Sequence, residues 1–184
     1  MRNSGKQPAA FLDRDGTIIK AVPYIKDPSL VEVPAAVLSG LQQLRAAGFL
    51  LILISNQSGI ARGYFTEQEM LAVHRRMCEL LAEGGITLDG YYYCPHAVTP
   101  GSCNCRKPLT GMLEKACRDF AIDRQHSAMF GDSDCDMQLA ANFNIPGLLL
   151  FDERNAANPQ LATQVCRDFQ EAAEWLLQYA GRWP

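Results

Sequence analysis

Two carboxylates, Asp13 and Asp15, stand two residues apart at the end of an apolar run near the start of the chain. The apolar residues 9–12 precede them and Gly16 follows, which is typical of a buried strand that stops at a turn. Open α/β sheets bind ligands at the carboxyl ends of their strands, so paired acids at this point could hold a cation or act on a substrate. Taken alone, the same motif is also compatible with an ordinary acidic turn.

Three further polar residues follow apolar stretches later in the chain. Ser55 comes directly after residues 49–54, Asp132 follows another apolar run, and Lys107 lies in a long connection after a third. The carboxyl ends of parallel strands meet at one edge of a sheet, so these side chains should converge with Asp13. Two carboxylates suit Mg²⁺, which takes oxygen ligands, and a hydroxyl, loop N–H groups and a lysine suit a phosphate.

The combined set indicates phosphoryl-transfer chemistry. A metal ion, an ammonium group and a hydroxyl around a phosphoryl group act mainly by positioning and by neutralising charge. A carboxylate beside the metal can act as nucleophile and form an aspartyl-phosphate. A second carboxylate two residues further on can protonate the leaving oxygen and later activate water.

The elements that would position these groups alternate along the chain. Short apolar stretches predict strands, and apolar residues at helical spacing predict helices between them. The expected strands cover residues 9–12, 49–54, 90–93, 127–130 and 147–151, and the expected helices cover 34–48, 66–83, 111–120, 134–142 and a segment from Asp168 onward. This alternation predicts an α/β fold with a parallel sheet and helices on both faces.

Length and composition limit the class of protein. With 184 residues, 48% of them hydrophobic and 20% charged, the chain should fold as one globular domain over residues 1–184. A net charge of −3 offers no electrostatic reason to expect nucleic acid or an anionic membrane as a partner. No apolar run approaches the ~20 residues of a membrane span, and no signal peptide is visible, so we expect a cytoplasmic protein. A monomer is expected as well.

A cluster of soft metal ligands lies between residues 94 and 107. Cys94, His96, Cys103 and Cys105 supply three thiolates and one imidazole, which suits a closed tetrahedral zinc site. Zinc would fold a long loop that has no core of its own and would hold the nearby Lys107 in place. Reduced thiols without metal are the alternative, and redox catalysis is a weaker one, because C-x-C is not the thioredoxin spacing.

Together the motifs resemble the four motifs of the haloacid-dehalogenase-like (HAD) phosphatases, in order and in strand context: Asp13-Arg14-Asp15-Gly16-Thr17, Ser55, Lys107 and Gly131-Asp132-x-x-x-Asp136. The resemblance implies a Rossmann-like HAD fold in which Asp13 is the nucleophile and Asp15 the general acid/base. It also implies that Ser55 and Lys107 hold the phosphate. The gaps between motifs leave no room for a large cap domain, so an open site is expected.

The same resemblance implies how the metal ion is held. Asp13, the backbone carbonyl of Asp15 and Asp132 would bind Mg²⁺. Asp136 would support these ligands without binding the metal itself. An aspartate at position 15 fits a phosphatase rather than a dehalogenase or an ATPase.

A narrower resemblance concerns the substrate. Three segments are similar to the D-glycero-D-manno-heptose 1,7-bisphosphate 7-phosphatases: Asn56-Gln57-Ser58-Gly59-Ile60-Ala61-Arg62-Gly63, Tyr93-Cys94-Pro95-His96 and Cys105-Arg106-Lys107-Pro108. This similarity implies a phosphorylated sugar as substrate, contacts to it from Asn56 and Arg106, and a place in lipopolysaccharide or S-layer heptose synthesis. Tyr24, Lys26, Gln57 and Arg62 are weaker candidates for substrate contact.

Three alternatives remain open at this point. The histidinol-phosphate phosphatases are close relatives that share the Cys/His loop, so histidinol-phosphate is a second possible substrate. A non-catalytic binding module stabilised by zinc is an alternative of another class, although the complete set of acidic motifs argues against it. A redox or metal-carrier protein is the third.

Overall fold

A six-stranded sheet forms the centre of the structure, a computed structural model that describes residues 5–99, 101, 103–152 and 156–181. The strand order is β3-β2-β1-β4-β5-β6, and every neighbouring pair is parallel. The strands are β1 (Ala9–Leu12), β2 (Leu50–Asn56), β3 (Gly90–Cys94), β4 (Ala128–Gly131), β5 (Gly147–Leu150) and β6 (Gln164–Cys166). The predicted parallel sheet is confirmed, and β6 is a strand that the sequence did not predict.

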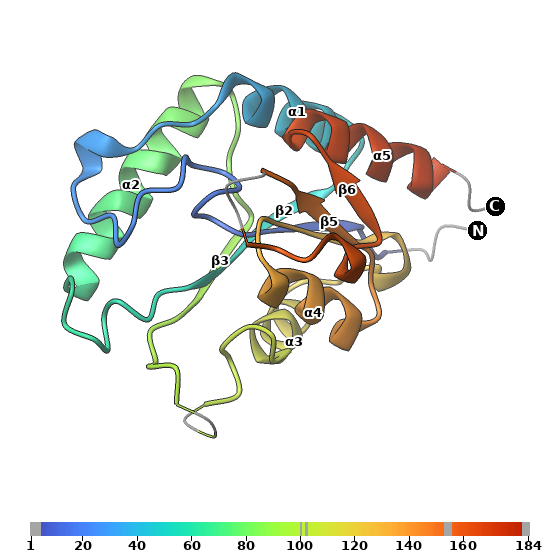
Figure 1. The fold of residues 1–184 in the computed structure, drawn as a ribbon. Coiled ribbons are helices and arrows are strands. Elements are labelled where there is room, and N and C mark those ends of the chain that lie inside the picture. Colours follow the sequence, from blue (N-terminus) through green and yellow to red (C-terminus); the bar gives the residue numbers. More distant parts are fainter. Residues whose placement is uncertain (1–4, 100, 102, 153–155, 182–184) are drawn as a thin grey trace.

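Helices cover both faces of the sheet, as predicted. The helices are α1 (Ala35–Ala46), α2 (Glu67–Glu83), α3 (Gly111–Asp119), α4 (Asp134–Phe143) and α5 (Phe169–Gly181). One buried core contains residues of α1, α2 and α5, and the other contains residues of α3 and α4. Figure 1 shows α1 and α5 on one side of the strands and α3 and α4 on the opposite side.

Strand β1 illustrates why the apolar runs are continuous. Ala10 and Leu12 face the core beneath α1, α2 and α5, whereas Ala9 and Phe11 face the core above α3 and α4. All four side chains are fully buried. A strand covered on both faces needs apolar residues at every position, so no hydrophobic-polar alternation is present in the sequence.

Local signals set the ends of the helices. Thr66 and Glu69 form a complete capping box at the start of α2. Gly48, with φ of +84°, follows the end of α1 in the left-handed conformation that glycine adopts most readily. Pro34 is the N-cap residue of α1 and not a residue of its first turn, so the helix begins one residue later than predicted.

The strand order fixes where a ligand can bind. The chain runs from β1 outward to β3 and then resumes on the other side of β1 with β4, so the carboxyl ends of β1 and β4 form a topological switch point. Among the described residues, the segments between β1 and α1 and between β3 and α3 are loops with a single 3-10 turn, at Pro28–Leu30, and add no cap domain over this edge. Of the helices described, none combines the length and apolar composition needed to cross a lipid bilayer.

Candidate active site

A buried lysine connects the acidic groups at the switch point. The ammonium Nζ of Lys107 lies 2.6 Å from Asp13 Oδ1 and 2.6 Å from Asp136 Oδ1, and donates to the carbonyl oxygen of Ile54 at 3.1 Å. Asp13 and Ile54 accept hydrogen bonds from this ammonium group, and Asp136 forms an ion pair with it. The chain thus brings together residues that are 94 positions apart in the sequence.

The backbone of Lys107 is fixed by Asn56. The side-chain oxygen of Asn56 accepts from the Lys107 N–H at 3.0 Å, and its amide nitrogen donates to the Lys107 carbonyl at 3.2 Å. Asn56 is the last residue of β2, so the sheet itself sets the position of the lysine loop. The sequence predicted a substrate contact for Asn56, whereas its amide is engaged with the protein in this structure.

Two glycines allow the acidic side chains to approach the strand ends. A Cβ atom on Gly16 would lie 2.0 Å from Asp132 Oδ2, and the residue has a φ of +88°. A Cβ atom on Gly131 would lie 2.3–2.6 Å from the side chain of Asp136. Both positions therefore require glycine if the carboxylates are to stay where they are.

Burial and like charges perturb the ionisable groups. Burial raises the pKa of Asp13 to about 8 despite the attraction of Lys107, and the charges of Asp136 and Asp132 add to the rise. Burial together with the charge of Asp136 raises the pKa of Asp132 to about 6. Burial alone would lower the pKa of Lys107, but Asp13 and Asp136 raise it above its usual value. This cluster therefore holds the lysine charged and contains two carboxyls whose raised pKa values a bound cation would lower.

The acidic cluster has the donors of a divalent cation site. Oxygen atoms of Asp13, Asp132 and Asp136 all lie within 4.8 Å of one another. Asp136 uses Oδ1 on Lys107 and Oδ2 on the hydroxyl of Ser133, which suits a supporting role. Asp13 and Asp132, at the ends of β1 and β4, are the oxygen donors that face the switch point.

Asp15 is held by two neighbours. Arg14 donates to it from Nε and from Nη2, the latter at 2.9 Å, although the Arg14 side chain is almost fully buried. The amide nitrogen of Gln57 donates to Asp15 Oδ2 at 2.9 Å and to Ser55 Oγ at 2.8 Å. The sequence analysis predicted no role for Arg14 and only a weak candidacy for substrate contact for Gln57. A charged residue between two acids was the available signal for Arg14.

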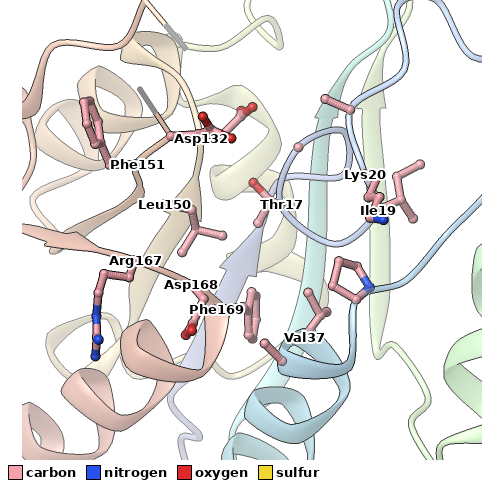
Figure 2. Close-up of a pocket in the computed structure, with 15 residues that line it drawn as sticks. Thr17, Ile19, Lys20, Val37, Asp132, Leu150, Phe151, Arg167, Asp168 and Phe169 are labelled. Carbon is pink, nitrogen blue, oxygen red and sulfur yellow. The ribbon is translucent and has the colours of Figure 1, made fainter. Parts of the chain in front are cut away.

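Two hollows flank the strand ends. The first, of about 380 Å³, is lined by Asp15, Asn56 and Gln57 together with the loop that carries Tyr24. The second, of about 670 Å³, reaches Asp132 and Thr17 at one part and Arg167 and Asp168 at another (Figure 2). Only the smaller hollow is lined by the predicted acid/base Asp15, and neither lining includes Arg106.

Arg106 lies beside a third hollow of about 370 Å³, whose lining also includes Lys107 and Cys135. Its buried Nη1 has no hydrogen-bond partner among the described atoms. Arg106 is therefore near the site through its neighbour in the chain, but it does not face the hollow beside Asp15.

The four predicted soft ligands come together. Cys94 Sγ lies 3.7 Å from Cys103 Sγ and 3.5 Å from His96 Nδ1, and Cys105 Sγ lies 3.4 Å from the same nitrogen. Two thiolates on one tetrahedral zinc ion, each bound at about 2.3 Å, would be about 3.8 Å apart. The spacing and the ligand types therefore fit zinc. Residues 100 and 102 of this loop lie outside the described residues.

Comparison with known proteins of similar sequence and fold identifies the family of this chain. The sequence model of the polynucleotide kinase 3 phosphatase family matches residues 8–172. D-glycero-β-D-manno-heptose-1,7-bisphosphate 7-phosphatase of Yersinia pestis is 39% identical over 176 residues, which cover 92% of this chain and 89% of that protein. The enzyme of the same name from Pasteurella multocida is 43% identical over 148 residues, covering 77% and 80% of the two chains.

This chain belongs to the heptose bisphosphate phosphatase family of HAD-like phosphatases. A solved structure agrees with this assignment. The D,D-heptose 1,7-bisphosphate phosphatase from B. bronchiseptica, in complex with magnesium and phosphate, superposes with a TM-score of 0.80 at 31% identity. The match covers 94% of this chain and 99% of that one. The chain is therefore a phosphatase with the HAD fold, as its motifs implied.

Proposed function

We propose that this phosphatase removes the 7-phosphate of D-glycero-D-manno-heptose 1,7-bisphosphate through an aspartyl-phosphate on Asp13. The contact between Lys107 and Asp13, at 2.6 Å, carries the proposal, because it sets a phosphate-binding cation beside a candidate nucleophile. The names of the similar enzymes from Y. pestis and P. multocida support this substrate and favour its β anomer. The heptose 1-phosphate product would serve lipopolysaccharide or S-layer heptose synthesis in the cytoplasm.

The residues divide the reaction into two steps. Ser55 and Lys107 bind the phosphoryl oxygens, a carboxylate oxygen of Asp13 bonds to phosphorus, and the bond to the sugar oxygen breaks. Asp15 gives its proton to that oxygen and becomes a carboxylate. It then takes a proton from the water that attacks the aspartyl-phosphate, which releases inorganic phosphate and restores Asp13.

Mg²⁺ fits the acidic cluster, with Asp13, Asp132 and the backbone carbonyl of Asp15 as its protein ligands. The raised pKa values of Asp13 and Asp132 support this, since a cation between them would stabilise both ionised forms. The bound ion would supply charge neutralisation for the phosphoryl group. Ionised Asp13 is the form that can attack phosphorus.

The sugar would occupy the hollow of about 380 Å³ that Asp15 lines. The leaving oxygen must come within hydrogen-bond reach of Asp15, and of the two flanking hollows only this one is lined by Asp15. Tyr24 lines it, packs edge-to-face on Tyr64 with ring centres 4.4 Å apart, and accepts from Arg62 Nη1 at 3.1 Å. These exposed rings offer an apolar surface on which a sugar ring could pack. We expect the chain to act as a monomer.

Arg106 is the candidate for the distal phosphate, because its buried Nη1 has no hydrogen-bond partner among the described residues and could donate to a phosphate oxygen. Zn²⁺ would hold Cys94, His96, Cys103 and Cys105 and act on the reaction only by keeping the loop that carries Lys107 in place.

The test is a comparison of kcat/KM with Mg²⁺ for both anomers of the heptose bisphosphate, for histidinol-phosphate and for a 3′-phosphorylated oligonucleotide. A preference of a hundredfold or more for one heptose anomer, about 2.7 kcal/mol of transition-state binding, supports the proposal. A preference for histidinol-phosphate or for the oligonucleotide would refute the substrate and keep the chemistry. Asp13→Asn should abolish turnover and leave the fold intact, as judged by circular dichroism.

A further inference from the structure

We propose that Gln57 is a positioning residue that links phosphate binding to proton transfer, by orienting the hydroxyl of Ser55 and by selecting the oxygen of Asp15 that carries the proton. The inference rests on the proposed roles of Ser55 and Asp15 and extends them to a residue outside the four HAD motifs. Gln57 is 3% exposed, and its amide lies between these two side chains.

The orientation of the Gln57 amide follows from its partners. An ionised carboxylate can only accept hydrogen bonds, so Gln57 must present its NH₂ group to Asp15. The same nitrogen then also donates to Ser55 Oγ, at 2.8 Å. Because the Ser55 oxygen is already an acceptor, its own O–H remains available for a different acceptor, which at this strand end is a phosphoryl oxygen.

The two oxygens of Asp15 are not equivalent. Oδ2 accepts from Gln57 Nε2 at 2.9 Å and from Arg14 Nη2 at 2.9 Å, so both of its lone pairs are used. Oδ1 accepts only from Arg14 Nε, at 3.1 Å, among the contacts described. A proton on Oδ2 would meet two N–H donors, so the proton that Asp15 transfers must reside on Oδ1. Gln57 and Arg14 thereby determine the direction from which the leaving oxygen is protonated.

The backbone of Gln57 has separate contacts, which allows its side chain to be tested alone. Its N–H donates to the Cys94 carbonyl at 2.8 Å, and its carbonyl accepts from the Ile60 N–H at 3.2 Å. Gln57→Met keeps these bonds and the approximate length of the side chain, and removes both side-chain hydrogen bonds. Gln57→Glu keeps the size but repels Asp15 and accepts the Ser55 O–H.

The first experiment compares kcat/KM for two esters, the heptose bisphosphate and p-nitrophenyl phosphate. A sugar alkoxide needs a proton in order to leave, whereas p-nitrophenolate leaves as a stable anion, so loss of acid positioning affects the first ester more. For Gln57→Met we expect a loss of about 100-fold in kcat/KM for the sugar ester and less than about tenfold for the aryl ester. Gln57→Glu should lose more on both esters.

A matched control is Gln42→Met, because the Gln42 amide donates to the Gly84 carbonyl at an exposed site on other elements. This variant should match the wild type on both esters. Equal losses on the two esters for Gln57→Met would indicate a purely structural role and overturn the proposal. A rise in KM with unchanged kcat would indicate direct contact with the sugar and would also overturn it.

Failure of the proposed function would look different. If the wild type hydrolyses neither ester, that function is wrong, and the positioning role is then judged from crystal structures of the wild type and Gln57→Met. The proposal requires that Asp15 Oδ2 and Ser55 Oγ both contact Gln57 in the wild type, and that the Asp15 or Ser55 side chain turns in the variant. Unchanged side chains in the variant would overturn it.

Discussion

Replacing Asp136 by asparagine tests how the site holds its lysine. Asp136 is fully buried, and its Oδ1 lies 2.6 Å from Lys107 Nζ. Asparagine keeps an oxygen that can accept from the ammonium group but removes the charge. Loss of the only partner of a buried ion costs about 3–5 kcal/mol, and hydrogen bonds to charged groups contribute about 1.5–3 kcal/mol. Because Lys107 retains Asp13, we expect the lower range, a loss of about 2–3 kcal/mol in the free energy of unfolding.

The expected change is large enough to measure by urea denaturation in buffer without added Mg²⁺. For a chain of this length it corresponds to a fall in Tm of about 4–12 °C. The control is Asp134→Asn, two residues earlier in the first turn of the same helix, where Asp134 Oδ1 accepts from the backbone N–H of Asn158. Both variants lose a negative charge that favours the helix N-terminus, so this contribution cancels in their difference. Equal losses in the two variants would refute the reasoning.

Three further outcomes follow from the same contacts. Because the pKa of Asp13 is raised to about 8 and that of Asp132 to about 6, the folded state binds more protons than the unfolded chain between about pH 4 and 8. The free energy of unfolding without Mg²⁺ should therefore fall as pH rises through this window, and Mg²⁺ should restore it most at pH 8; urea titrations at pH 5 and pH 8 measure both effects. Cys103→Ser should lose zinc and lower activity indirectly, and an unchanged zinc content per chain would show that the ligand set is wrong. Asn56→Ala removes two hydrogen bonds to the Lys107 backbone and should therefore lower kcat more than it raises KM. A change in KM alone would instead indicate that Asn56 contacts the substrate.

The sheet and its helices were predictable because their signals are local. A strand such as β2 (Leu50–Asn56) is buried on both faces, so it stands out as a continuous apolar run. The missed strand β6 (Gln164–Cys166) has three residues, of which Val165 is exposed, and it forms only by pairing with β5. No property of those three residues alone distinguishes them from a loop.

The site was predictable as a set of positions and not as a set of contacts. Parallel strands deliver their end residues to one edge, so Asp13, Ser55 and Asp132 follow from the strand pattern alone. The partners of Asn56 and Lys107 do not follow, because these residues are 51 positions apart and meet through a loop with no regular structure. The burial of Arg14 was even harder to predict. A charged residue is expected at the surface, and Arg14 is buried in an ion pair with the adjacent Asp15.

Lys107 is supported from three separate parts of the fold, and this has a consequence for how substitutions combine. Asn56 at the end of β2 holds its backbone, Asp136 at the start of α4 holds its ammonium group, and Cys105 lies two residues before it in the chain. Supports that share one partner do not contribute independently, because once one is lost the others no longer hold the lysine in a productive position. Loss of zinc and loss of Asn56 should therefore lower activity by less in combination than the product of their separate effects.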